Sequence, residues 1–457
     1  MRSVNWNMTV SFTVFLFCAV HSGIAQPNSY DLAITHSNVF NSRTGKVTAG
    51  QTILVKAGTI ELVTASPGKY TAAKTIDASG RLVTPGFIDT HIHLTDVFGD
   101  YNKAPARISP DSISYYRKNL SDTYLPYGVT TVMIMGEPEA WLPVTIGWMK
   151  NPVPDCPDIY TVGGALISKE SRKPYLNHIT VSSPGEASKK VIEYYGMGIR
   201  HIKLYWCLRR PEFEAAFKTA DSLGMRAYGH IDQNIMFMDT TLTIGLRNYE
   251  HIMTLDNSVI HFAQDGPAFN NQLKPVYGNR PVSFPVVRME MWRFMQEHKR
   301  AALDSLIDKV AKNKTSFSTT IHLFAAAFGL SYFSETRDTS LTVVELARCK
   351  ENFNIFMRYA KKMYDKGIQL RIGTDCPYGG KALLSELLLL HEHGFATASI
   401  LQIASLNGAR ALGLDKRYGV IEKGKRANLL IWEKSPFMNY RNFLSSKTII
   451  KDGVVLQ

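Results

Sequence analysis

Eight short apolar runs, separated by helix-like stretches, most strongly limit how the middle of this chain can fold. Amphipathic segments such as 212–223 and 345–366 lie between the runs. Strands that alternate with helices favour a parallel sheet, and eight such units are the number that a TIM-type (β/α)₈ barrel requires. We therefore predict an α/β fold with such a barrel. The eight predicted strands are residues 86–91, 130–135, 159–163, 201–205, 226–230, 246–251, 317–322 and 369–374.

The two ends of the chain follow a different pattern from the middle. Residues 31–84 contain short alternating runs broken by turns, and the same pattern returns after residue 419. An alternation with period two is typical of strands and hairpins. We therefore predict a small β-sandwich domain with an N-terminal part at 26–84 and a C-terminal part at 416–457, and a barrel at 85–415.

Residues 1–25 have the pattern of a signal peptide. Arg2 precedes an apolar run at 10–20, and the small residues Gly23 and Ala25 follow it. The run is too short to span a bilayer comfortably, so cleavage and export to the periplasm or the exterior are expected. An uncleaved interfacial helix is the alternative. The rest of the chain has no apolar stretch of membrane-spanning length, so we expect no membrane association after cleavage.

The formal net charge of +13 raises the question of a nucleic-acid partner. Lys and Arg are scattered, without a long basic run or a nucleic-acid-binding motif. Diffuse charge of this kind indicates a general surface property or mild steering of anionic substrates. We expect a small-molecule substrate and no nucleic acid, and the sequence leaves open whether the chain forms a homo-oligomer.

The most specific motif is the pair His91 and His93 at the end of the first predicted barrel strand. In a strand, residues i and i+2 lie on one face, close enough for two imidazoles to share one cation. The C-terminal ends of barrel strands form the mouth where active sites lie. An isolated His-x-His pair is usually a coincidence, but this one directly follows the strand-like segment 85–89, Pro-Gly-Phe-Ile-Asp.

This segment resembles the opening metal motif of the amidohydrolase superfamily, especially its imidazolonepropionase-like and Xaa-Pro dipeptidase-like branch. The resemblance continues in order along nearly the whole chain. Segment 198–205 is similar to the fourth strand, whose lysine is carboxylated, and Gly373-Thr374-Asp375 is similar to the eighth strand. Gly229-His230 and Tyr249-Glu250-His251 resemble the fifth and sixth strands, and 404–413 and 419–428 resemble the closing helix and return strand.

The resemblance implies a site with two divalent metal ions, zinc by default. It places His91, His93 and Asp375 on one ion, His230 and His251 on the other, and carboxylated Lys203 between them. Taken singly, each residue has a plainer interpretation: a surface lysine, a core histidine or a helix-capping aspartate. Their occurrence on five strands in barrel order favours the metal site.

The activity that the resemblance implies is hydrolysis of an amide-type C–N bond by metal-activated hydroxide, with Asp375 transferring the proton. N-acyl amino acids, dipeptides and cyclic amides are the candidate substrates. The segments 133–138 and 231–233 differ from peptide-cleaving relatives, so a peptide preference does not transfer. The alternatives are a mononuclear deaminase of the same superfamily and a non-catalytic metal-binding descendant.

Three further residues are weaker substrate-binding candidates. His322, at the end of the seventh predicted strand, faces the mouth in this interpretation, against the alternative of a structural histidine. Arg209 and Arg210 follow the fourth strand and could hold a substrate carboxylate, against the alternative of a solvated loop. The long segment 253–314, with a predicted helix at 287–310, is a candidate substrate cover.

Overall fold

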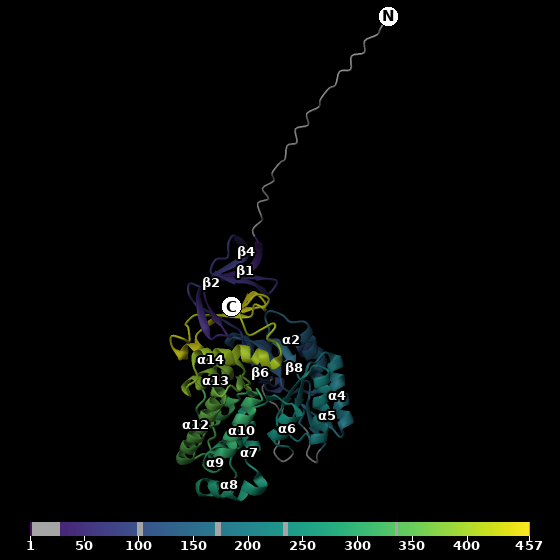
Figure 1. The fold of residues 1–457 in the computed structure, drawn as a ribbon, viewed down its shortest axis with the longest axis vertical. Coiled ribbons are helices and arrows are strands. Elements are labelled where there is room, and N and C mark those ends of the chain that lie inside the picture. Colours follow the sequence, from purple (N-terminus) through teal and green to yellow (C-terminus); the bar gives the residue numbers. More distant parts are fainter. Residues whose placement is uncertain (2–27, 98–103, 170–174, 232–235, 334–336, 457) are drawn as a thin grey trace.

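The computed structural model describes residue 1 and residues 28–97, 104–169, 175–231, 236–333 and 337–456. The predicted signal peptide lies outside these residues, apart from Met1. Figure 1 shows a sheet from the chain ends at one pole of the molecule and the helices α8 and α9 at the other.

Strands from both ends of the chain form one eight-stranded sheet in the order β18-β17-β16-β5-β1-β2-β3, with β4 paired to β1. The N-terminal and C-terminal parts of the chain meet at the centre of this sheet. There β16 runs antiparallel to β5, and Trp432 Nε1 donates to Thr84 Oγ1 at 3.0 Å. A separate apolar cluster lies on this sheet, with Ile34, Val83 and Ile431 in it. The strands are β1 (Asn28–Asn41), β2 (Lys46–Lys56), β3 (Thr59–Thr64), β4 (Tyr70–Asp77), β5 (Leu82–Pro85), β16 (Leu429–Trp432), β17 (Lys447–Lys451) and β18 (Val454–Leu456).

The middle of the chain forms two sheets in which all neighbouring strands are parallel. Backbone hydrogen bonds from Thr90 N to Ile372 O and from Asp375 N to His91 O, both 2.9 Å, join their first and last strands. This arrangement is compatible with a TIM barrel. One sheet is β6 (Phe87–Ile92), β7 (Val129–Ile134) and β8 (Asp158–Thr161). The other is β10 (His178–Val181), β9 (Ala165–Ser168), β11 (His201–Leu204), β12 (Arg226–Gly229), β13 (Asn248–Tyr249), β14 (Ser316–Ser318) and β15 (Gln369–Arg371).

Helices connect the parallel strands and cover them, with α4 and α5 packed together on one flank (Figure 1). In the ranges that the model describes, no helix is both long and apolar enough to cross a membrane. The helices are α1 (Leu94–Val97), α2 (Ile113–Tyr124), α3 (Leu142–Lys150), α4 (Pro184–Met197), α5 (Arg210–Ser222), α6 (Met238–Ile244), α7 (Asp256–Val259), α8 (Phe262–Tyr277), α9 (Phe284–His298), α10 (Arg300–Lys312), α11 (Ile321–Ala327), α12 (Val343–Asp365), α13 (Gly380–Glu392), α14 (Thr397–Gln402) and α15 (Gly408–Leu412).

The structure corrects three details of the predicted elements. The seventh strand ends at Ser318, and His322 lies in the helix α11 instead. The segment 253–314 is mostly helical, and the predicted helix at 287–310 is two helices, α9 and α10. The strands β9 and β10 were not predicted.

Candidate metal centre

His91 and His93 lie at the C-terminal end of β6, a strand whose residues are all buried. Gly86 precedes the strand, and a Cβ atom there would lie 2.2 Å from Thr130 Oγ1, so only glycine allows β6 to approach β7 this closely. The Nε2 atoms of the two histidines are 3.3 Å apart. The period-two spacing therefore places both imidazoles on one face, as the sequence predicts.

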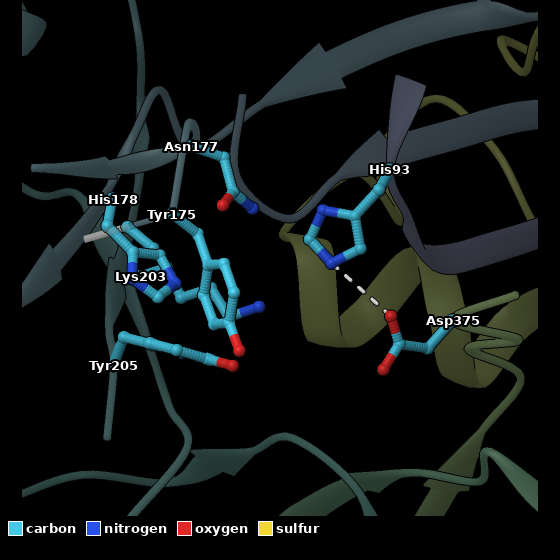
Figure 2. A pocket seen from close by; sticks show the side chains of 8 residues that line it. His93, Tyr175, Asn177, His178, Lys203, Tyr205 and Asp375 are labelled. Atoms are coloured by element: carbon cyan, nitrogen blue, oxygen red, sulfur yellow. Dashed lines mark ion pairs between the residues drawn. The ribbon is translucent and has the colours of Figure 1, made fainter. Parts of the chain in front are cut away.

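The Asp375 carboxylate brings three histidines together. Its Oδ1 lies 3.5 Å from His91 Nε2 and 3.3 Å from His93 Nε2, and its Oδ2 lies 3.4 Å from His251 Nε2. Ligand atoms of His91, His93 and Asp375 all lie within 4.8 Å of one another, close enough to hold one metal ion. Figure 2 shows His93 and Asp375 facing each other at the edge of a cavity.

The second ring nitrogen of each of these histidines is held by a protein atom. His91 Nδ1 lies 2.6 Å from Glu250 Oε2, and His93 Nδ1 lies 3.0 Å from the carbonyl oxygen of Gly136. His251 Nδ1 lies 2.6 Å from Thr320 Oγ1, which itself donates to Gly373 O. Metal-binding histidines typically have such partners, which fix the ring and leave the other nitrogen for the metal.

Glu250 is a buried anion behind His91. Arg371 Nη2 donates to its Oε1, and Ser318 Oγ donates to its Oε2 at 2.7 Å. Burial alone would raise the pKa of Glu250, but Arg371 and His91 outweigh burial and lower it. Glu250 and Arg371 are both completely buried, so this pair is part of the interior that supports the histidine.

The backbone is strained where the site is built. Asp375, His251 and Thr320 have positive φ angles of 49°, 67° and 52°. Residues other than glycine rarely adopt this conformation, which costs about 1–3 kcal/mol per residue and occurs frequently at functional sites. The fold thus holds a ligand-bearing segment in conformations that the local sequence disfavours.

His230 and Lys203 border this cluster. The ring of His230 lies 5.0 Å from that of His251, and His230 Nδ1 is buried without a hydrogen-bond partner among the described residues. Lys203 Nζ donates to Met135 O at 2.8 Å and lies 3.4 Å from His91 Nε2. All six predicted ligands therefore lie in one region, and an unpartnered buried imidazole nitrogen is an atom that a cation would satisfy.

The charge state of the cluster suits a divalent cation. Burial lowers the pKa of His91 and of Lys203, and lowers that of His251 to about 3. Burial alone would raise the pKa of Asp375, but the neighbouring histidines, His91 first, hold it well below its usual range. Neutral imidazoles and an ionised carboxylate are the forms that bind metals.

A cavity of about 330 Å³ opens beside the cluster (Figure 2). Sequence reasoning missed five of its residues, among them Ala165 at the start of β9 and Tyr205 directly after β11. The other three are Tyr175, Asn177 and His178, which lie at and before the start of β10. The signal was a run of aromatic and polar residues in the connection between the third and fourth predicted strands. The cavity is lined by His93, Ala165, Tyr175, Asn177, His178, Lys203, Tyr205 and Asp375.

The three weaker candidates do not line this cavity. Arg209 pairs with Glu212 and Arg210 with Glu214, each at 2.7 Å within the first turns of α5, which favours the alternative of a solvated segment.

His322 is completely buried in α11, 5.7 Å from the ring of Tyr378 between centroids. Its ring nitrogens have no partner among the residues that the model describes, and burial lowers its pKa to about 4. His322 therefore lies outside the cavity lining, and no hydrogen bond of its ring among the described residues assigns it a structural role.

Two models of the amidohydrolase family match the chain, one at residues 74–154 and the other at residues 313–456. An imidazolonepropionase from Brevibacillus brevis is 31% identical over 103 residues, which are 21% of this chain and 24% of that protein. Adenine deaminase 2 from Carboxydothermus hydrogenoformans is 30% identical over 184 residues, 38% of this chain and 29% of that protein. The matched segments thus span less than a third of these curated relatives.

Solved structures are similar over nearly the whole chain. An Xaa-Pro dipeptidase with bound methionine in its active site has a TM-score of 0.64 at 17% identity, covering 93% of this chain and 99% of that one. The A. niger ochratoxinase has a TM-score of 0.64 at 14% identity, covering 94% and 96%. At these identities the likeness shows the fold alone.

Proposed function

We propose that the chain belongs to the amidohydrolase family, whose models match residues 74–154 and 313–456, and that it is a metal-dependent hydrolase that cleaves amide-type C–N bonds. The observation that carries this proposal is the convergence of three Nε2 atoms, from His91, His93 and His251, on the Asp375 carboxylate. Each imidazole is oriented from behind by a second protein atom, as in metal centres.

The proposed centre holds two divalent cations, zinc by default for a nitrogen-rich ligand set. His91, His93 and Asp375 would hold one cation, and His230 and His251 the other. The unpartnered Nδ1 of His230 supports the second position. Lys203 would join the two as a carbamate, since its buried Nζ lies next to His91 and a carbamate adds two oxygen ligands there.

When bound, the cations would lower the pKa of a water molecule and polarise the scissile carbonyl. Asp375 lines the cavity and contacts the histidines, so its carboxylate would take the proton of the attacking water. The same carboxylate would then deliver this proton to the leaving nitrogen. Glu250 and Thr320 would hold His91 and His251 in place during this transfer.

A second candidate is a deaminase with one metal ion. Its support is that His91, His93 and Asp375 alone form a complete three-ligand group, and that one relative is an adenine deaminase. In that case Lys203 would have no role as a bridge. Release of ammonia from a substrate that has no primary amide group distinguishes this activity from amide hydrolysis.

We also propose how this centre is placed in the whole chain. The parallel strands would close into a (β/α)₈ barrel at 85–415, which the hydrogen bonds between β6 and the segment after β15 support. The terminal sheet would form a β-sandwich domain from 26–84 and 416–457. Residues 1–25 would direct export to the periplasm or the exterior and then be cleaved.

Metal analysis of the purified full chain tests the proposal. We expect about two divalent ions per chain, loss of at least one in Lys203→Ala, and no loss in Lys218→Ala, whose side chain is 73% exposed. The metal-loaded protein is then screened against N-acyl amino acids, dipeptides and cyclic amides, with ammonia measured in parallel. A chain that binds no metal and hydrolyses no amide contradicts the proposal. If Lys203→Ala binds two ions and keeps full activity, this result contradicts the bridging role of Lys203 and leaves the rest of the proposal in place.

A further inference from the structure

The cavity beside the metal centre has one wall made of rings. The centroids of Tyr175 and His178 are 5.1 Å apart, and those of His178 and Tyr205 are 4.8 Å apart. Figure 2 shows these side chains on one side of the cavity and His93 with Asp375 on the other. We call Tyr175, His178 and Tyr205 the aromatic wall. A group placed next to the metal centre would therefore contact these rings.

Few of the described residues that line the cavity are charged. Apart from histidines they are Lys203 and Asp375, and both are assigned to the metal centre. The nearby Arg209 and Arg210 are paired with glutamates of α5 and lie outside the lining. The wall thus presents ring faces and edges, with no guanidinium that could form a bidentate pair with a carboxylate.

Backbone hydrogen bonds hold the segments of the aromatic wall together. His178 N donates to Tyr175 O at 3.0 Å, and Tyr205 N donates to Leu166 O at 3.0 Å. The parallel pairing of β9 with β10 and with β11 ties the two segments into one sheet. Because these segments are already held in place, less conformational entropy is lost when a ligand binds to the wall, which favours affinity.

We propose that the aromatic wall binds a flat, uncharged ring next to the scissile C–N bond. The substrate class is then aromatic or heteroaromatic amides, in place of the carboxylate-bearing dipeptides and N-acyl amino acids. This inference rests on the proposed function, because the metal centre sets which bond faces the wall. Aromatic rings prefer offset or edge-to-face contacts at centroid distances of about 4.5–7 Å, and three rings on one wall provide several such contacts.

The test uses three hydroxamic acids that share one metal-binding head. Benzohydroxamate carries a flat ring, acetohydroxamate carries a methyl group, and succinic monohydroxamate carries a carboxylate. Their dissociation constants for the metal-loaded full chain are measured by titration calorimetry. We expect benzohydroxamate to bind roughly tenfold more tightly than acetohydroxamate, and the carboxylate probe to bind no better than acetohydroxamate.

Variants locate the preference on the wall. Tyr175→Ser and Tyr205→Leu should each reduce the ratio of the two dissociation constants toward one, whereas Tyr175→Phe should keep it. Tyr115→Ser, at a tyrosine on α2 that is 62% exposed, is the matched control and should also keep the ratio.

Equal affinities for all probes, tightest binding of the carboxylate probe, or an unchanged ratio in both Tyr175→Ser and Tyr205→Leu would overturn the inference but leave the metal centre in place. Failure of every hydroxamate to bind would instead remove the metal centre, and the proposed function with it.

Discussion

Two sides face each other across the cavity, and they differ in how their side chains are held. On the metal side, His91 and its partner Glu250 are completely buried, and the rings of His91, His93 and His251 are each held by a hydrogen bond from behind. On the other side, the Tyr175 side chain is 54% exposed and is placed by ring contacts and short strands. The proposed chemistry thus depends on an interior network, whereas the proposed contacts to the substrate come from a segment near the surface. A surface segment can change its residues at smaller cost to stability than an interior network can.

The largest expected effect is on the metal side, at Asp375. Asp375→Asn keeps the shape of the side chain but removes the charge that faces three histidines. Because general acid–base catalysis is typically worth about 10²–10⁴-fold, turnover of an amide substrate should fall by this factor. Asp365→Asn, on the surface of α12, is the control and should turn over normally. An Asp375→Asn enzyme with full metal content and near-normal turnover would exclude Asp375 from proton transfer.

A smaller effect is expected one layer behind the metal, at Glu250. Glu250→Gln removes the anion that holds His91 and leaves Arg371 buried without its charge partner. The supporting partners of metal ligands are typically worth about 10–100-fold in metal affinity or activity, so we expect metal affinity to fall in this range. Competition with a chelator of known affinity measures it, with the exposed Glu433→Gln as control. Unchanged affinity in Glu250→Gln would show that the metal side tolerates change as well as the aromatic wall does.

A third prediction concerns pH and Glu386, which holds the turn that carries Thr320. Glu386 is completely buried, accepts hydrogen bonds from Thr319 Oγ1 and His322 N, and has a pKa that burial raises from 4.5 to about 8. Because the pKa is higher in the folded state, protonation of Glu386 stabilises the folded chain. This stabilisation is fully present below about pH 4.5, the pKa of Glu386 in the unfolded chain. This stability is lost as the pH rises through about 8.

The side chain of glutamine does not ionise, so Glu386→Gln lacks this pH-dependent contribution. From pH 5 to pH 9, the free energy of unfolding of Glu386→Gln minus that of the wild type should therefore increase by at least about 1.4 kcal/mol, the value of one pKa unit. Urea unfolding of chelator-treated protein at both pH values measures the difference without any contribution from metal binding. Glu433→Gln should follow the wild type. Parallel pH dependences of Glu386→Gln and the wild type would show that Glu386 is already ionised in the folded chain.

The smallest effect is expected at Arg209 and Arg210. Both arginines lie outside the cavity lining and pair with glutamates of α5, Arg209 with the buried Glu212 and Arg210 with Glu214. Arg209→Ala and Arg210→Ala should therefore change the ratio of kcat/KM for a carboxylate substrate and its neutral amide by less than about twofold. A selective tenfold loss for the acid in either variant would place a carboxylate-binding residue on the substrate side after all.

The structure brings the predicted metal ligands together, because they lie at or just after the ends of short apolar strands. Parallel strands bring their carboxyl ends together, so His91, Lys203, His251 and Asp375 meet although they are far apart in the chain. The strand periodicity predicts even the common face of His91 and His93. The alternation of strands and helices predicts where these residues lie, whereas the complete ligand set was implied by the resemblance to the amidohydrolase superfamily.

The same reasoning could not find the rest of the site. The contact of Glu250 with His91 joins residues 159 positions apart and depends on side-chain packing, which no local pattern encodes. Tyr175 and His178 lie before and at the start of β10, a strand that the sequence pattern did not indicate. His322 shows the opposite error, since the chain leaves the seventh strand at Ser318 and turns into a helix before it reaches this residue.

The pairing of β5 with β16 has a consequence for the order of folding. β5 continues through Gly86 into β6, so the strand that carries His91 and His93 is anchored to a strand near the other end of the chain. The bond from Trp432 to Thr84 spans 348 positions. Contacts this distant form slowly, because the intervening chain must first be brought together. During synthesis on the ribosome, the first two proposed metal ligands, His91 and His93, therefore stay without their full support until residue 432 has emerged.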